Sequence, residues 1–103
     1  MSAIIIARYR GDASRFDEFL QSRQVAFADL SRLKRSKGCI SHRFLASSDE
    51  LLVVDEWPTV EQYEAMWAGD QPEVLRLVTE AGLEAADPPE VSYYHSLPDP
   101  GEF

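Results

Sequence analysis

Apolar residues recur along this chain at two spacings, one typical of strands and one typical of helices. Residues 2–9 form a short run rich in isoleucine that ends before Gly11, which predicts a strand buried on both faces. Residues 39–47 and 50–57 also have strand character, and the two residues between them predict an antiparallel hairpin. Residues 91–97 predict a fourth strand.

The first gap between strands has helical spacing. Apolar residues there predict one long amphipathic helix that begins near Asp12 or Ser14, with Ser14 and Asp17 in the spacing of a capping box. The helix is expected to end in a basic cluster before Gly38. Because cations are favourable at the negative end of a helix dipole, we interpret this cluster as structural.

The gap after the third strand predicts two shorter helices. Thr59 and Gln62 form a second capping box, and the helix that follows is expected to stop at Gly69. Another helical segment is predicted from Asp70 to Gly82, before the Asp-Pro-Pro stretch at 87–89.

This order of elements is the split βαβ, ferredoxin-like βαββαβ plan of an α+β domain. We expect one such domain over residues 1–97, followed by a flexible C-terminal tail over residues 98–103. Right-handed crossovers place the helices on one face of the sheet. Residues 4–6 and 51–54 are consecutive apolar positions, so apolar side chains also point to the other face, where exposure costs about 25 cal/mol per Å². A homodimer that packs sheet against sheet is therefore predicted.

Charge and cysteine content narrow the function classes. A net charge of −8 argues against nucleic acid or an anionic membrane as partner and favours a small molecule. The apolar runs are too short to cross a bilayer. Cys39 is the only cysteine and no signal peptide is recognisable, which predicts a cytoplasmic protein without an intrachain disulfide. No residue spacing matches a metal site or a phosphate-binding loop, so no metal or cofactor is expected.

Three polar side chains are candidates for proton transfer. His42 and His95 are the two groups that ordinarily exchange protons near neutral pH, although a histidine on an exposed or edge strand is more commonly just solvated. Asp55 alternates with Val53 and Trp57 and must share their face. Burial in a cavity would raise the pKa of the Asp55 carboxyl and make it a base candidate, whereas the alternative is a salt bridge, for instance to Arg8 or Arg43.

Three aromatic residues are candidates for a ligand cavity. Trp57 closes the third strand, and Tyr63 and Trp67 lie on one stripe of the helix that follows. For Trp57 and Tyr63, packing in the core is the commoner explanation, and for Trp67 a place in the core or cavity wall is favoured over catalysis.

Three short segments resemble the antibiotic biosynthesis monooxygenase family: GCISHR at 38–43, VVDEW at 53–57 and EQYEA at 61–65. The resemblance implies a dimeric α+β barrel. Some members oxidise anthrone or quinol rings with molecular oxygen and without metal or flavin. In those members a tryptophan at the end of the third strand and a tyrosine six residues later line the cavity, and Trp57 and Tyr63 match them. An asparagine four residues before the tryptophan is replaced here by Val53, and the chain contains no asparagine.

Other members of that family degrade haem, and Trp67 matches a tryptophan that they carry. Their iron ligand is a histidine nine or ten residues later, where this chain has Arg76 and Leu77. Their first strand also provides an asparagine, where this chain has Ala7 and Arg8. Haem degradation is therefore not expected.

The leading hypothesis is a cofactor-independent monooxygenase of small aromatic or quinol-like compounds. The predicted catalytic residues are Tyr63, His42 and Asp55, and the predicted substrate-binding residues are Trp57, Trp67 and His95. The alternatives are a non-catalytic small-ligand-binding or interaction protein on the same dimeric scaffold, and an isomerase or other proton-transfer enzyme.

Overall fold

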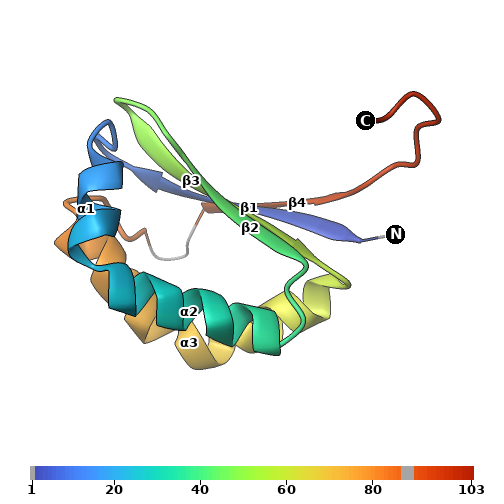
Figure 1. Cartoon of the computed structure of the whole chain (residues 1–103), viewed down its shortest axis with the longest axis horizontal. Coiled ribbons are helices and arrows are strands. Elements are labelled where there is room, and N and C mark those ends of the chain that lie inside the picture. The colour runs from blue at the N-terminus through green and yellow to red at the C-terminus, as the bar shows by residue number, and fades with distance from the viewer. Residues whose placement is uncertain (1, 87–89) are drawn as a thin grey trace.

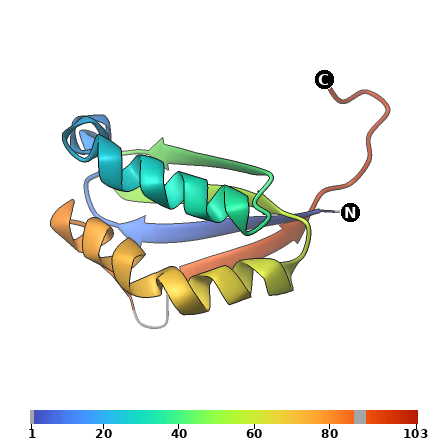
Figure 2. The ribbon, with the colours of Figure 1, turned by 60° about the horizontal axis from the view of Figure 1, so that its bottom comes forward.

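Four antiparallel strands form one sheet, and all helices lie on one of its faces (Figures 1 and 2). The computed structural model describes residues 2–86 and 90–103. Its elements are β1 (Ala3–Arg10), α1 (Phe16–Ser22), α2 (Gln24–Ser36), β2 (Ser41–Ala46), β3 (Glu50–Trp57), α3 (Val60–Glu80) and β4 (Glu90–His95). The strand order β2-β3-β1-β4 confirms the predicted ferredoxin-like α+β fold.

The two central strands are those with the longest apolar runs. β1 pairs with β3 from Ala3 opposite Trp57 to Arg10 opposite Glu50, and β2 pairs with β3 through the predicted hairpin. Side chains alternate between the faces, so Leu51, Asp55 and Trp57 are buried under the helices. The shared face of Asp55 and Trp57 is thereby confirmed.

The prediction of one long first helix was wrong, because α1 and α2 are separate and meet at Arg23. The Ser22 hydroxyl donates to the Phe19 carbonyl oxygen at 2.8 Å, a local hydrogen bond that competes with continuation of the helix. The Ser14 capping box is also absent. Instead the Asp12 carboxylate accepts hydrogen bonds from the Ser14 amide and hydroxyl.

The prediction of two helices between Thr59 and Gly82 was also wrong, since α3 is continuous and contains Gly69, Asp70 and Pro72. Both halves of α3 bury residues against the sheet, so one continuous apolar stripe outweighs the local break signals: Tyr63, Met66, Leu77 and Val78. Asp70 does not cap a helix but accepts a hydrogen bond from Lys37 Nζ at 3.0 Å.

Other end signals are confirmed. Thr59 Oγ1 accepts a hydrogen bond from the Gln62 amide at 3.2 Å and caps α3. Gly38 ends the turn after α2 with a φ of +113°. Residues that have a Cβ rarely adopt this backbone conformation. The proposed turn at 87–89 lies outside the described residues.

The face of the sheet opposite the helices is uncovered, as predicted (Figure 2). Its centre is apolar and partly exposed: Ile4, Ile6, Leu52 and Val54. Leu45 and Tyr94 are exposed at its two edges. At one end, ion pairs cross three strands, from Arg8 to Glu50 and from Arg10 to Glu90.

After β4 the chain leads away from the sheet (Figure 1). Leu97 and Phe103, near and at its end, are exposed. No helix in the described part of the chain is long and apolar enough to span a membrane.

Candidate functional site

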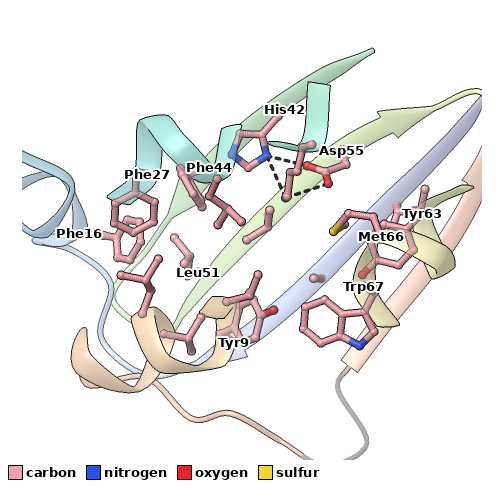
Figure 3. A pocket seen from close by; sticks show the side chains of 18 residues that line it. Tyr9, Phe16, Phe27, His42, Phe44, Leu51, Asp55, Tyr63, Met66 and Trp67 are labelled. Carbon is pink, nitrogen blue, oxygen red and sulfur yellow. Dashed lines mark hydrogen bonds and ion pairs between the residues drawn. The ribbon is translucent and has the colours of Figure 1, made fainter. Parts of the chain in front are cut away.

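A cavity of about 40 Å³ lies between the sheet and the two long helices (Figure 3). Its walls are mostly apolar, with contributions from β1, β3, α2 and α3, among them Ile5, Ala7, Leu51, Val53, Phe27, Leu30, Met66, Trp67, Val74 and Leu77. Five polar side chains also reach it: Tyr9, Lys34, His42, Asp55 and Tyr63. The cavity is therefore an apolar space with polar groups at defined points of its wall.

Asp55 is the centre of a buried polar cluster in this wall. Its Oδ1 lies 2.6 Å from His42 Nδ1, and its Oδ2 lies 3.0 Å from Lys34 Nζ. The indole nitrogen of Trp57 also donates to Oδ2, at 3.2 Å. His42 and Asp55 face each other across the β2–β3 pair, whereas Lys34 reaches the carboxylate from α2. One carboxylate thus accepts three hydrogen bonds.

The short distance between His42 and Asp55 fixes the tautomer of the imidazole. A carboxylate is only an acceptor, so at 2.6 Å His42 Nδ1 must carry the proton and donate it. Lys34 Nζ lies 3.4 Å from the same nitrogen but is only a donor, so this approach is not a hydrogen bond. Nε2 then keeps its lone pair, and within the described residues it has no hydrogen-bond partner. His42 can therefore accept a proton at Nε2.

Of the two alternatives for Asp55, the salt bridge is present, with Lys34 as its partner, and the raised pKa is not. Burial does favour the protonated carboxyl, but the hydrogen bond from His42 and the positive charge of Lys34 outweigh it and lower the pKa. The partners suggested for the salt bridge were wrong. Arg8 pairs with Glu50 on the uncovered face, and Arg43 points to that same face opposite Val54.

Lys34 was overlooked because it belongs to the basic cluster that we interpreted as structural. Only 6% of its surface is exposed, unlike that of its neighbours in the cluster. Phe27, Leu30 and Lys34 follow one another at helical spacing and all line the cavity. The sequence did contain a signal for this position, because Lys34 continues the apolar stripe of Phe27 and Leu30.

Two tyrosine hydroxyls, of Tyr9 and Tyr63, are the remaining polar groups in the cavity wall. Burial raises the pKa of Tyr9 to about 12 and raises that of Tyr63 further, so both hydroxyls stay protonated. Neither hydroxyl is hydrogen-bonded to a described residue, and Figure 3 shows both pointing inwards among the side chains that line the cavity. Tyr9 was not predicted, although it alternates with Ile5 and Ala7 on the helix-covered face.

The remaining predicted residues differ in position. Trp67 lines the cavity. Trp57 is fully buried and does not line it, but packs edge-on against Tyr63 and orients Asp55. His95 is exposed on β4 beside Tyr94 and lies outside the cavity, so the structure does not group it with His42. Burial raises the pKa of the Cys39 thiol to about 11, which leaves it an unreactive core residue.

The cavity has room for a few water molecules, whereas ligand pockets usually measure several hundred Å³. An aromatic ligand therefore enters only if surrounding side chains move apart. A groove on the outer surface between α2 and α3 is separated from the cavity by Leu30, which lines both spaces.

No protein-family model matches the chain, and no curated protein matches it either. Solved structures do. SnoaB, a cofactor-independent oxygenase from Streptomyces nogalater, is 16% identical, with 98% of each chain covered and a TM-score of 0.63. A conserved protein from Methanosarcina mazei Go1 is 16% identical, with 94% of each chain covered and a TM-score of 0.64.

A proposed antibiotic biosynthesis monooxygenase from Deinococcus radiodurans is 11% identical, with 98% of each chain covered and a TM-score of 0.62. At such identities the likeness concerns the fold. It confirms the resemblance in the hairpin and in the helix that follows: this chain has the fold of the antibiotic biosynthesis monooxygenases.

Proposed function

We propose that this protein is a cofactor-independent monooxygenase that oxidises small aromatic or quinol-like compounds with molecular oxygen. The observation that carries the proposal is the pairing of His42 with the buried Asp55 at the wall of an apolar cavity. A fold shared with a cofactor-independent oxygenase supports it. Fold alone does not define a reaction, so the argument rests on the chemistry of the side chains.

The first step in this proposal is removal of a proton from carbon. In an anthrone, the ring methylene lies opposite a ring carbonyl, so loss of a methylene proton gives an anion delocalised onto the carbonyl oxygen. His42 Nε2 is the acceptor for this proton, and the Asp55 carboxylate stabilises the imidazolium that forms. Because Asp55 stays ionised, it serves this role without taking the proton itself.

The anion then reacts with oxygen directly. It gives one electron to dioxygen, and the two radicals combine to a peroxide anion at the former methylene carbon. His42 returns its proton to this peroxide, and loss of water then leaves a carbonyl. One oxygen atom enters the product and the other leaves in water, so no external reductant is needed. The apolar walls keep bulk water away from the anion and the peroxide.

In this proposal Tyr63 is a hydrogen-bond donor and not the base. Since its pKa is raised, its hydroxyl donates a hydrogen bond to substrate oxygen. Trp67 supplies a flat apolar wall on the same helix. Trp57 positions Asp55 from outside the cavity.

The proposed assembly is a homodimer in which two uncovered sheet faces pack together. The face has an apolar centre of Ile4, Ile6, Leu52 and Val54. Burying it against a second copy removes this surface from water, and the partly exposed ion pairs at its end would form a polar rim. Sheet pairing also leaves the helix side open for ligand entry at Leu30.

Oxygen uptake with 1,8-dihydroxyanthrone in air tests the proposal. We expect uptake above the uncatalysed rate, one oxygen consumed per molecule of product, and, under ¹⁸O₂, one labelled atom in the new carbonyl. A chelator should leave the rate unchanged. If neither an anthrone nor a hydroquinone is consumed faster than in buffer alone, the oxygenase proposal is wrong and a ligand-binding role replaces it.

A further inference from the structure

Lys34 has more hydrogen-bond donors than its surroundings use. An ammonium carries three N–H groups and no acceptor. One of them donates to Asp55 Oδ2 at 3.0 Å, and the neighbouring His42 Nδ1 cannot accept because it is itself protonated. Two N–H groups of Lys34 therefore have no acceptor among the described residues, although the side chain is more than nine-tenths buried and lines the cavity.

No other acceptor in the cavity wall is bonded to them. The Tyr9 and Tyr63 hydroxyls and His42 Nε2 are able to accept, but among the described residues none of them forms a hydrogen bond with Lys34 Nζ. A buried cation with unused donors in such a space is costly unless an acceptor reaches it. The cavity thus leaves two N–H groups of Lys34 available to an oxygen acceptor of a ligand.

The charges of the cluster show which acceptor fits. Lys34 and Asp55 balance each other, and His42 with one ring proton is neutral. Proton transfer to His42 from a ligand would leave a negative ligand beside an imidazolium and an ammonium, with the total charge of the cavity unchanged. An oxyanion, or a hydroxyl that becomes one, is therefore matched by this cluster, whereas a cationic ligand is not.

We propose that Lys34 is a substrate-binding residue that takes the ionised oxygen of the ligand. The ligand class is a planar aromatic compound with an acidic hydroxyl, or a carbonyl that becomes an enolate. This inference rests on the proposed function for the choice of cavity, but it concerns binding and not turnover. Lys34 then supplies a donor in a cavity whose described lining contains no side-chain amide.

The test compares two coloured probes of nearly equal shape, 2-hydroxy-1,4-naphthoquinone, which is an anion near neutral pH, and its 2-methoxy analogue, which is neutral. Quenching of tryptophan fluorescence reports the Kd of each. A hydrogen bond to a charged group predicts that the wild-type protein binds the hydroxy probe about 10-fold to 100-fold more tightly. Equal affinities for the two probes in the wild-type protein would overturn the inference without any variant.

A paired substitution assigns the preference to Lys34. Lys34→Met with Asp55→Asn removes both charges together and leaves no unpaired buried charge. In this variant the Kd values of the hydroxy and methoxy probes should differ by less than about 3-fold. Asp55 repels an anion but also stabilises a protonated His42, so Asp55→Asn alone is measured beside the pair. A preference that Asp55→Asn keeps and the double variant loses belongs to Lys34. The matched control is Lys37→Met with Asp70→Asn, which removes a surface pair of the same composition and should keep the wild-type preference.

The result is separable from that of the oxygenase test. A preference that depends on Lys34 without oxygen uptake supports this inference and rejects the proposed function. Oxygen uptake with no preference, or with a preference that survives in the Lys34→Met, Asp55→Asn variant, rejects this inference and leaves the proposed function standing.

Discussion

The buried pair of Lys34 and Asp55 makes a sharp prediction about stability. Their side chains are 7% and 2% exposed, and the ammonium and carboxylate lie 3.0 Å apart. We consider Lys34→Met, Asp55→Asn and the variant with both changes. Methionine fills a similar volume to lysine without its charge, and asparagine keeps the shape of aspartate, so packing changes little.

The expected magnitudes differ among the three variants. Removing one partner of a buried ion pair costs about 3 to 5 kcal/mol, because the other charge stays buried and uncompensated. Lys34→Met belongs at the lower end, since His42 and Trp57 still donate to Asp55. Asp55→Asn belongs at the upper end. Removing both partners should be close to neutral, which gives a coupling of at least about 6 kcal/mol between the two charges.

Urea unfolding monitored by circular dichroism measures each free energy of unfolding, with Lys37→Met as the control at an exposed lysine directly after the same helix. The control should lie within about 1 kcal/mol of the wild type. Single variants that each cost less than about 1 kcal/mol, or costs that simply add in the double variant, would refute the idea that these charges balance each other in the core.

Three further predictions concern acid stability, entry and assembly. The pKa of Asp55 in the folded protein is lowered from 3.8, so its ionised carboxylate stabilises the fold above pH 3.8 and this stabilisation is lost as the pH falls through the folded pKa. Below about pH 4 the wild type should therefore lose stability more steeply than the Lys34→Met, Asp55→Asn variant. Urea unfolding at several pH values measures this difference. Leu30→Ala should speed the binding of the naphthoquinone probes and Leu30→Trp should slow it, as stopped-flow fluorescence would show; equal rates would place the entrance elsewhere. Val54→Lys on the uncovered face should convert a dimer into a monomer by light scattering, and a dimer that survives this change would point to another interface.

The parts of the fold that the sequence predicted are those set by local signals. The isoleucine run of β1, the hairpin between β2 and β3, and the Thr59 cap each depend on residues close together in the chain. Alternation along β3 was enough to place Asp55 and Trp57 on one face.

The errors in the predicted helices arose where contacts between residues distant in the chain decide where a helix ends. The break at Arg23 lets Phe16 and Phe27 pack together, with ring centroids 5.9 Å apart, and both contact Phe44 from β2. The continuity of α3 depends on its apolar stripe against the sheet and overrides Gly69 and Pro72.

The candidate site was predicted in part for the same reason. His42 and Asp55 were found from their chemistry, and their pairing follows from the hairpin register. Lys34 is 21 residues before Asp55 and approaches it from a helix that covers the sheet. No periodic pattern in the sequence links two residues in this way. Without Lys34, the direction of the Asp55 pKa shift was left open between a buried acid and a salt bridge.

The rate of 1,8-dihydroxyanthrone oxidation in the His42→Gln variant tests the central claim most directly. Glutamine can still donate to Asp55 but cannot accept a proton, so the rate should fall by about 10²-fold to 10⁴-fold while folding is unchanged by circular dichroism. The matched control is His95→Gln, at an exposed histidine outside the cavity, and it should stay within about 2-fold of the wild type. Equal rates in the wild type and the His42→Gln variant would contradict the assignment of His42 and Asp55 as the catalytic pair.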